Sequence, residues 1–308
     1  MASIFLKPNH PPHYIEAIEV YRIAPDTDSP TKLRIASGGA GQSGLIRTFA
    51  EGFIKHHVKT TGAAPFAIAW MASDTTMSFN SLALKAVDMS ITYHPVAEKT
   101  AIQQGIADRR EYIWRDHWML VGPRSNPANL STTGSPSIYD LFTQLFRACI
   151  ETQNAKIPIR FLSRYDKSAA NIKESNLWTA IGQTPWSYPH SSWYHTYVDF
   201  PFRALEVAAL LGEYSLVDKG TWWSVEPWIR EKLMVFKLGE DDEDDPLLNP
   251  AHALVSSKSD NKELAHEFVD WLTSEDGGQE VARTFTKNGV VLYSAAPPRK
   301  GLLSKPKL

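Results

Sequence analysis

The chain has little cysteine, no large excess of either charge and no long apolar run. A single cysteine, Cys149, in 308 residues excludes a disulfide within the chain. Its apolar helical surroundings predict a buried small side chain rather than a nucleophile. The formal net charge of −2 argues against a nucleic-acid binder, because such proteins usually present a basic face. No apolar stretch approaches the roughly 20 residues that cross a bilayer, so we expect no membrane insertion.

No secretory leader is visible either, because the segment from Met1 to Leu6 is too short and lacks a basic start. We therefore expect a cytoplasmic protein, or an extracytoplasmic one if the N-terminus has been trimmed. The chain is rich in the hydrophobic and aromatic residues that form protein cores. Hydrophobic residues make up 43% of it and 10 residues are tryptophan, which is enough to fill two cores. We expect a monomer with two lobes.

The first candidate site is a glycine-rich loop between an apolar run and a helical pattern. Residues 33–36 are strand-like, and four glycines follow among residues 38–44. Glycines let the backbone approach a ligand closely, and Ser43 can cap a helix whose apolar face includes Leu45 and Phe49. Unpaired N–H groups at such a helix start favour an anion. The candidate ligand contacts in this loop are Ser37, Gly38, Gly39, Gln42 and Ser43.

Three other interpretations of this loop compete with an oxyanion site. A Walker phosphate loop needs Lys and then Ser or Thr after its last glycine, and Leu45 and Ile46 stand there instead. The dinucleotide fingerprint matches residues 39–44, but it expects an acidic residue about 20 positions further on, and the nearest candidate, Asp74, comes late. The third interpretation is a strand-to-helix turn with no ligand. The rest of the chain favours the oxyanion site.

Helical and strand-like patterns alternate along the first part of the chain. Strand-like runs at residues 66–71 and 87–93 follow helical stretches, which predicts a parallel sheet with helices on both faces. A Gly-Pro break predicts a crossing to a second lobe near residues 121–124, and a short strand predicts the return near residues 250–255. The predicted domains are an N-terminal arm (1–31), lobe 1 (32–122 plus 250–296), lobe 2 (123–249) and a disordered tail (297–308).

A second strand-to-helix junction repeats the chemistry of the first. Residues 159–163 read as a short strand that stops at Arg164, and Arg164 and Ser168 are the candidate ligand contacts there. A guanidinium can pair with an anion in this position, although an arginine at a strand end can equally form an ion pair at the surface or between lobes. Further along, the acidic run at residues 240–245 is expected to be a solvated loop rather than a metal site.

No catalytic arrangement is visible, and we predict that the protein is not an enzyme. His94, His190 and His195 have no Ser, Cys or carboxylate beside them in a recognised motif, so core or cleft-wall roles are favoured. His10 and His13 form a pair without further metal ligands nearby. We therefore expect neither a metal nor a cofactor.

At this point several segments resemble, in order and spacing, the substrate-binding proteins of tungstate ABC importers, which are type II periplasmic binding proteins. The likeness runs from about Leu33 to Phe285. Its main pieces are residues 118–127, 163–168, 177–178, 193–194, 214–221, 245–250 and 268–274.

The resemblance implies two α/β lobes joined by two hinge crossings, with a small oxyanion held in the ligand-binding cleft between them. Hydroxyls, backbone N–H groups and one arginine would hold that anion. By matching position, Ser37 and the glycines after it stand where the family has a threonine and serine loop. Tyr93 and His94 stand where it has His and Ser, and Arg164 stands at its anion-pairing arginine.

The chain departs from the family at the cleft, where Gly38, Gly39 and Ala40 lack hydroxyl donors and bulky residues at 195–203 replace a glycine-rich turn. Aromatic side chains there could stack on an organic ring. We predict a non-enzymatic solute-binding protein for a tungstate- or molybdate-like oxyanion or an anionic metabolite. The alternative is a binding-protein scaffold that serves as an intracellular interaction protein or as an enzyme with an organic ligand. Without a visible signal peptide, an ABC permease partner is not expected.

Overall fold

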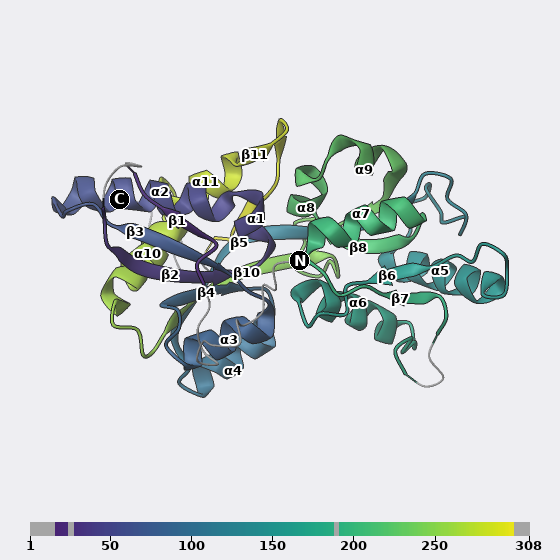
Figure 1. Ribbon diagram of the computed structural model, residues 1–308, viewed down its shortest axis with the longest axis horizontal. Coiled ribbons are helices and arrows are strands. Elements are labelled where there is room, and N and C mark those ends of the chain that lie inside the picture. Colours follow the sequence, from purple (N-terminus) through teal and green to yellow (C-terminus); the bar gives the residue numbers. More distant parts are fainter. Residues whose placement is uncertain (1–15, 24–27, 188–190, 299–308) are drawn as a thin grey trace, which may run out of the picture.

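The computed structural model describes residues 16–23, 28–187 and 191–298. These residues form two α/β lobes that lie side by side and are joined through one long strand, β5 (Ala107–Pro123) (Figure 1). The first part of β5 pairs within the sheet of lobe 1, and its last part pairs within the sheet of lobe 2. The predicted architecture of two α/β lobes is confirmed.

Lobe 1 is built on a mixed sheet whose inner strands are parallel. The second strand pairs in parallel with the third and the fourth, as expected where strands alternate with crossover helices. The first strand and the two long central strands run antiparallel to their neighbours. The order across the sheet is β1 (Glu19–Tyr21), β3 (Ala67–Ala72), β2 (Thr31–Ser37), β4 (Met89–Thr92), β10 (Leu248–Ser256) and β5, with β13 (Ser294–Ala295) also paired to β5.

Helices cover both faces of this sheet (Figure 1). One face carries α2 (Leu45–Thr61), α10 (Lys262–Thr273) and α11 (Gly278–Thr284), and the other carries α3 (Thr75–Ala83) and α4 (Pro95–Gln103). A short helix, α1 (Gly39–Ser43), precedes α2, and the β11–β12 hairpin (Thr286–Lys287 and Val290–Val291) follows α11.

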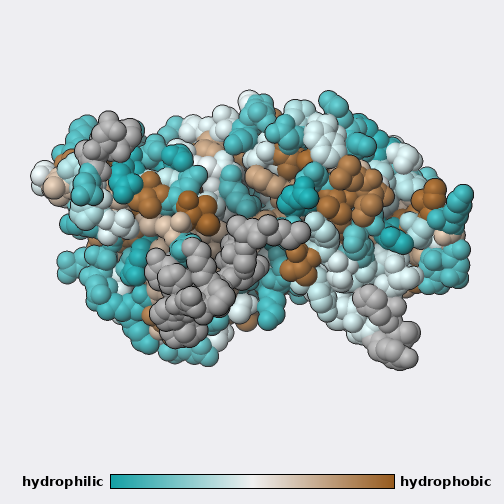
Figure 2. Space-filling model, viewed as in Figure 1, coloured by the Kyte–Doolittle hydropathy of each residue, from teal (hydrophilic) through white to brown (hydrophobic). Residues whose placement is uncertain are grey.

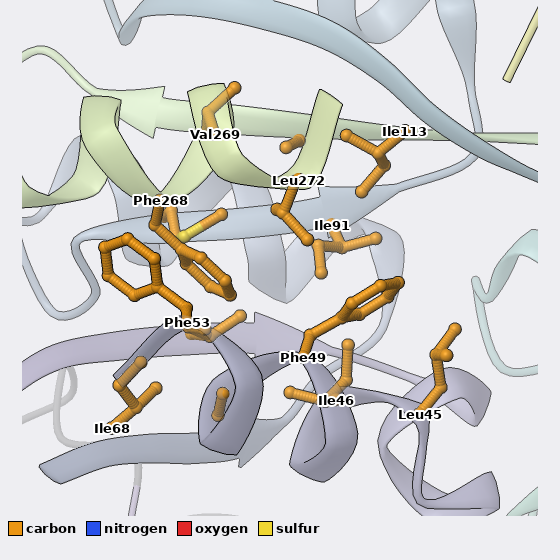
Figure 3. Close-up of a cluster of buried hydrophobic side chains, with 14 of the residues drawn as sticks. Leu45, Ile46, Phe49, Phe53, Ile68, Ile91, Ile113, Phe268, Val269 and Leu272 are labelled. Carbon is orange, nitrogen blue, oxygen red and sulfur yellow. The ribbon is translucent and has the colours of Figure 1, made fainter. Parts of the chain in front are cut away.

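The core of lobe 1 joins the beginning of the chain to its end. Phe49 and Phe53 of α2 face Phe268 and Leu272 of α10, and all four are at most 1% exposed (Figure 3). The rings of Phe53 and Phe268 lie 4.7 Å apart between centroids. Burial of such rings stabilises a fold by about 2 to 3 kcal/mol each, so this contact ties the returning segment to lobe 1.

Lobe 2 repeats the plan on a smaller scale. Its sheet consists of the end of β5, β8 (Tyr214–Asp218), β6 (Phe161–Ser163) and β7 (Tyr194–Thr196), with β9 (Leu233–Leu238) on the other side of β5. The pairs β6–β7 and β6–β8 are parallel. The helices of lobe 2 are α5 (Ile138–Thr152), α6 (Ala169–Ala180), α7 (Pro201–Leu211), α8 (Lys219–Ser224) and α9 (Pro227–Lys232).

The hinge lies a few residues before each predicted range. β5 pairs with β10 as far as His117 and with β8 from Trp118 onward, whereas the sequence suggested residues 121–124. The return crossing lies between Gly239, whose N–H donates to the carbonyl of Trp118, and Leu248, where β10 begins. At the first crossing β5 runs from His117 to Trp118 without a glycine or proline, so the Gly-Pro signal used for that prediction lies further along the chain.

Two local predictions need correction. Ser43 does not cap the long helix, because α1 comes first and Gly44, with a φ of 92°, stands at the start of α2. The residues expected to be a surface arm include β1, which pairs with β3, while residues 1–15 with His10 and His13 lie outside the described residues. Most of the tail predicted to be disordered, residues 299–308, also lies outside them.

Two other local predictions, the buried Cys149 and the exposed acidic run, are confirmed. Cys149 is a free, fully buried thiol in the apolar face of α5, and burial raises its pKa to about 12. The acidic run at residues 240–245 is an exposed loop, in which Asp241 lies 2.9 Å from the Nε2 atom of His117 on the hinge strand. Figure 2 shows a mostly hydrophilic face with separate hydrophobic patches. Within the described part of the chain, the helices are too short or too polar to span a membrane.

Candidate functional site

A cavity of about 500 Å³ lies between the two lobes. Its walls come from segments at or after the carboxyl ends of β2, β3, β4, β6, β7 and β8, together with the hinge residues Asp116, Trp118 and Asn249. In α/β sheets the carboxyl ends of parallel strands meet at one edge, and the helices that follow point their N-termini toward it. The topology of both lobes therefore brings loops and helix starts to this cavity.

Several helix N-termini face the cavity. The first residues of α1, α3, α6 and α7, or the residues just before them, line its wall, namely Gly39, Asp74 and Thr75, Ser168 and Ala169, and Phe200 and Pro201. Free N–H groups and the helix dipole give such a wall a partial positive charge. Part of this charge is already compensated, because Asp74 caps α3 by accepting a hydrogen bond of 2.7 Å from the N–H of Met77.

Six of the nine residues predicted as ligand contacts line this cavity. They are Gly38, Gly39, Gln42, Tyr93, Arg164 and Ser168. They come from both lobes and from three separate parts of the sequence, so the two strand-to-helix junctions recognised in the sequence do face each other. Contact between these residues and a ligand stays a prediction.

The other three predicted residues lie behind the cavity wall. Ser43 donates a hydrogen bond of 3.0 Å to the carbonyl of Ala40 and lies 2.8 Å from the hydroxyl of Tyr293. The Nδ1 atom of His94 accepts the N–H of Ala97 and caps α4. Ser37 is fully buried at the end of β2. The direction in which each side chain points is set by the turn that follows its strand, which residue type and spacing do not reveal.

Arg164 follows β6 and is the one cationic side chain among the described residues that line the cavity. Its Nε–H donates to the carbonyl of Asp199 at 3.1 Å, and its Nη2 atom pairs with the carboxylate of Asp166. The side chain is 14% exposed. Because a guanidinium carries five N–H donors, these contacts orient Arg164 and leave donors for a ligand.

Ser168 stands at the start of α6 beside Arg164. Its hydroxyl accepts the N–H of Asn171 at 3.4 Å, and its own N–H donates to Asp166 at 3.1 Å. Asp166 thus connects the arginine to the helix start. Together Arg164, Ser168 and the first turn of α6 combine the one cationic side chain of the described cavity wall with a helix N-terminus, and we call them the Arg164 corner.

Sequence analysis missed the aspartates that line the cavity. Besides Asp74 and Asp166, they are Asp116, Asp199 and Asp218. Asp218 caps α8, because its carboxylate accepts the N–H of Thr221 at 2.8 Å and the hydroxyl of the same residue. A helix-capping aspartate directly after a buried strand is a recognisable pattern, so Asp74 and Asp218 could have been identified from the sequence.

Asp116 is the buried acid of the hinge. It is 4% exposed, accepts the N–H of His117 at 2.7 Å, and lies on β5 just before the chain enters lobe 2. Burial raises the pKa of Asp116 well above its usual range, and the nearby carboxylate of Asp218 raises it further. A raised pKa favours the protonated, neutral form of Asp116 relative to that of an exposed aspartate, and the neutral form lessens the negative charge that an anionic ligand would meet.

We expect the substitution Asp116→Asn to remove a pH dependence of anion binding. In the native protein, raising the pH ionises Asp116, and the added negative charge lowers affinity by up to about tenfold per pH unit above its pKa. Asparagine keeps the shape of a neutral acid and cannot ionise. Calorimetric titrations from neutral to alkaline pH should show a falling affinity for the native chain and a flat one for the variant. Parallel profiles would contradict this role.

Aromatic and apolar side chains complete the cavity wall. Tyr93 and Trp118 stand on the side of lobe 1 and the hinge, and Phe200 stands on lobe 2. Burial holds the pKa of Tyr93 well above its usual range, so its phenol stays a hydrogen-bond donor. In the part of the chain that the structure covers, no three His, Cys, Asp or Glu side chains are grouped so as to hold a metal ion.

Two α/β lobes that enclose a ligand-sized cavity and are joined by paired hinge strands are the architecture of the periplasmic binding proteins. The family model of the PBP (periplasmic binding protein) superfamily domain matches residues 24–276. The chain belongs to this superfamily, and the predicted fold of the type II binding proteins is confirmed.

Individual relatives agree with this assignment. A crystal structure provisionally described as a periplasmic metal-binding protein is 49% identical, with a TM-score of 0.83, and the match covers 91% of this chain and all of that one (100%). A protein of Haloferax volcanii, provisionally named as an ABC transporter anion-binding protein, is 28% identical over 67% of this chain. The tungstate-binding protein TupA of Peptoclostridium acidaminophilum is 24% identical over 61% of it. The matches span 56% and 60% of the lengths of these two curated relatives. The resemblance to tungstate-binding proteins is thereby confirmed.

Proposed function

We propose that this chain is a non-enzymatic solute-binding protein that holds an organic molecule with one anionic group in the cavity between its lobes. The observation that carries the proposal is the Arg164 corner, a guanidinium beside a helix N-terminus in the wall of a cavity of about 500 Å³. A guanidinium and free backbone N–H groups suit a carboxylate or phosphate. Relatives named as anion-binding and tungstate-binding proteins support this choice of ligand class.

The size of the cavity favours an organic anion over tungstate or molybdate. Sites for organic ligands typically measure about 300 to 1,000 Å³, and the volume here, about 500 Å³, falls within that range. The aromatic walls formed by Tyr93, Trp118 and Phe200 would contact the body of such a molecule.

The charges that line the cavity also favour an organic anion over tungstate or molybdate. Five aspartates and a single arginine line it among the described residues. A compact dianion in the middle of the cavity would bring two negative charges close to Asp218, whereas an organic molecule with one anionic group keeps that group at the Arg164 corner.

The contacts of the histidines support a binding role without catalysis. His94 caps α4, and the Nδ1 atom of His195 lies 2.7 Å from Glu213. Neither residue lines the cavity. The relatives are likewise named for binding rather than for a reaction.

A thermal-shift screen tests this proposal. The compounds are tungstate, molybdate, acetate, benzoate and phenyl phosphate. A ligand at a hundred times its dissociation constant stabilises the fold by about 2.7 kcal/mol, which should raise the melting temperature of a chain of this length by roughly 4 °C. We expect the two aromatic anions to give the largest shifts. Shifts by tungstate and molybdate alone would contradict the organic ligand, and no shift by any of the five would contradict anion binding.

A further inference from the structure

We infer that Glu174 is a positioning residue of the ligand site, whose buried carboxylate holds residues 163–168 in the conformation that presents Arg164 and Ser168 to the cavity. This inference rests on the proposed anion-binding role of the Arg164 corner. Glu174 itself does not line the cavity. It lies in the second turn of α6 and is 2% exposed.

The carboxylate of Glu174 accepts hydrogen bonds from residues of three elements, β6, β7 and α6. Its Oε1 atom accepts the hydroxyl of Tyr194 on β7 at 2.9 Å and the side-chain amide of Asn171 on α6 at 2.8 Å. It also accepts the hydroxyl of Ser163, the last residue of β6 and the neighbour of Arg164. Each of these neighbours presents a donor, so the ionised carboxylate, which only accepts, fits the arrangement.

Ser163 connects Glu174 to the loop through two hydrogen bonds of its hydroxyl group. With its hydroxyl hydrogen directed at Glu174, its Oγ atom accepts the backbone N–H of Tyr165 at 3.1 Å. Tyr165 and Lys167 have φ angles of 48° and 59°, in the left-handed region that side chains other than glycine rarely adopt. Such a conformation persists only where its surroundings hold it. The bond from Tyr165 to Ser163 is one such support, and Glu174 orients the acceptor.

The buried carboxylate of Glu174 costs free energy that an apolar side chain at the same position would not. Burial raises the pKa of Glu174 to about 7, although the hydrogen bonds from Ser163, Tyr194 and Asn171 oppose the rise. The carboxylate of Asp166 in the loop raises this pKa further. α5 and β8 also pack on α6, where they contribute apolar side chains such as Phe142 and Leu216. A strongly shifted acid directly beneath a binding loop is typical of a functional site.

Protonation of Glu174 would turn it into a donor among donors and weaken its hold on Ser163. We therefore expect anion affinity to fall as the pH drops below about 7. This direction is opposite to that expected for Asp116, so the two groups together predict a bell-shaped profile, and Glu174→Gln should remove only its acidic limb. Glutamine, like the protonated acid, keeps one acceptor oxygen for Ser163 and adds donors, so this variant should show the weaker binding of the acidic state at every pH.

The test compares three variants of the full chain by hydrogen–deuterium exchange and by titration with phenyl phosphate. Glu174→Ala should speed exchange in residues 163–168 and weaken binding by about tenfold, as loss of a supporting hydrogen-bond partner commonly does. Glu174→Gln, which mimics the protonated acid, should fall between the native chain and Glu174→Ala in both exchange and affinity. The control is Asp88→Ala in lobe 1, which removes another fully buried carboxylate, one that pairs with Arg34. It should lower stability without changing exchange in residues 163–168.

The two measurements separate this inference from the proposed function. Unchanged exchange in residues 163–168 of Glu174→Ala would overturn the positioning role, whatever the ligand. Faster exchange with unchanged affinity for phenyl phosphate would also overturn it, because the loop would not matter for binding. A native chain that binds none of the screened anions would overturn the proposed function, while the exchange arm would still show whether Glu174 holds the loop.

Discussion

Replacement of Arg164 by alanine should weaken the binding of an anionic ligand by roughly ten- to a hundredfold. Hydrogen bonds to charged groups contribute about 1.5 to 3 kcal/mol, and the variant would lose all those that the guanidinium makes. Arg164→Lys should recover only part of the loss, because an ammonium cannot offer two parallel donors to a carboxylate or phosphate. Calorimetric titration of both variants with the anion that gives the largest thermal shift measures the effect.

The contacts of Arg164 within the chain define the controls for this experiment. Alanine would leave Asp166 without its cation, although Asp166 still accepts the N–H of Ser168. We therefore expect a loss of unliganded stability on the order of 1 kcal/mol. A matched control is Arg160→Ala, since Arg160 lies outside the cavity, 44% exposed and 3.9 Å from Glu213. Unchanged affinity in Arg164→Ala would place the anion site elsewhere, and a collapse of stability would make Arg164 a structural ion-pair partner.

The substitution Gly41→Ala should destabilise lobe 1 by about 3 kcal/mol, at the upper end of what overpacking in a core usually costs. A Cβ atom at this position would lie 2.0 Å from the ring of Trp70, which is 4% exposed and has little room to move. The indole N–H of Trp70 also donates to the carbonyl of Ser37 at 3.1 Å, so displacement of the ring would break this bond. The melting temperature should fall by roughly 5 to 10 °C.

Gly39→Ala is the matched control in the same loop. A Cβ atom there would have its nearest neighbours, the carboxylate oxygens of Asp218, at 3.7 Å, which is an ordinary contact. We expect its melting temperature to stay within about 1 °C of the native value, as for most substitutions away from packed sites. Equal losses in both variants would mean that the loop needs glycine for its backbone conformation rather than for packing against Trp70.

Gly39 and Gly41 have different roles in the loop, which the sequence did not reveal. Four glycines between a strand and a helix were taken as an approach path for a ligand. In the structure Gly38 and Gly39 do line the cavity, whereas Gly41 accommodates an indole ring from β3. The reason is tertiary, because Trp70 reaches this loop from a neighbouring strand of the sheet.

The Arg164 corner was accessible from the sequence for a physical reason. A short apolar strand that stops at an arginine and leads into a helix places the guanidinium at a strand end, and the parallel topology then turns this end toward the cavity. The aspartates were not accessible as a group. Asp116, Asp166 and Asp218 belong to a hinge strand, a loop and a helix cap, and they reach the same cavity only because β5, β6 and β8 fold into one sheet.

The sequence by itself determined the alternation of strands and helices, the apolar faces of the helices and the return of the chain to lobe 1. These features follow from local periodicity, because burial on one face repeats along each element. Only the tertiary structure decided which polar side chains meet. Ser43, for example, lies 2.8 Å from the hydroxyl of Tyr293, 250 residues away, and Glu174 supports the Arg164 loop from beneath the cavity wall. Such contacts depend on the direction of each side chain after the chain has closed on itself, which no spacing in the sequence specifies.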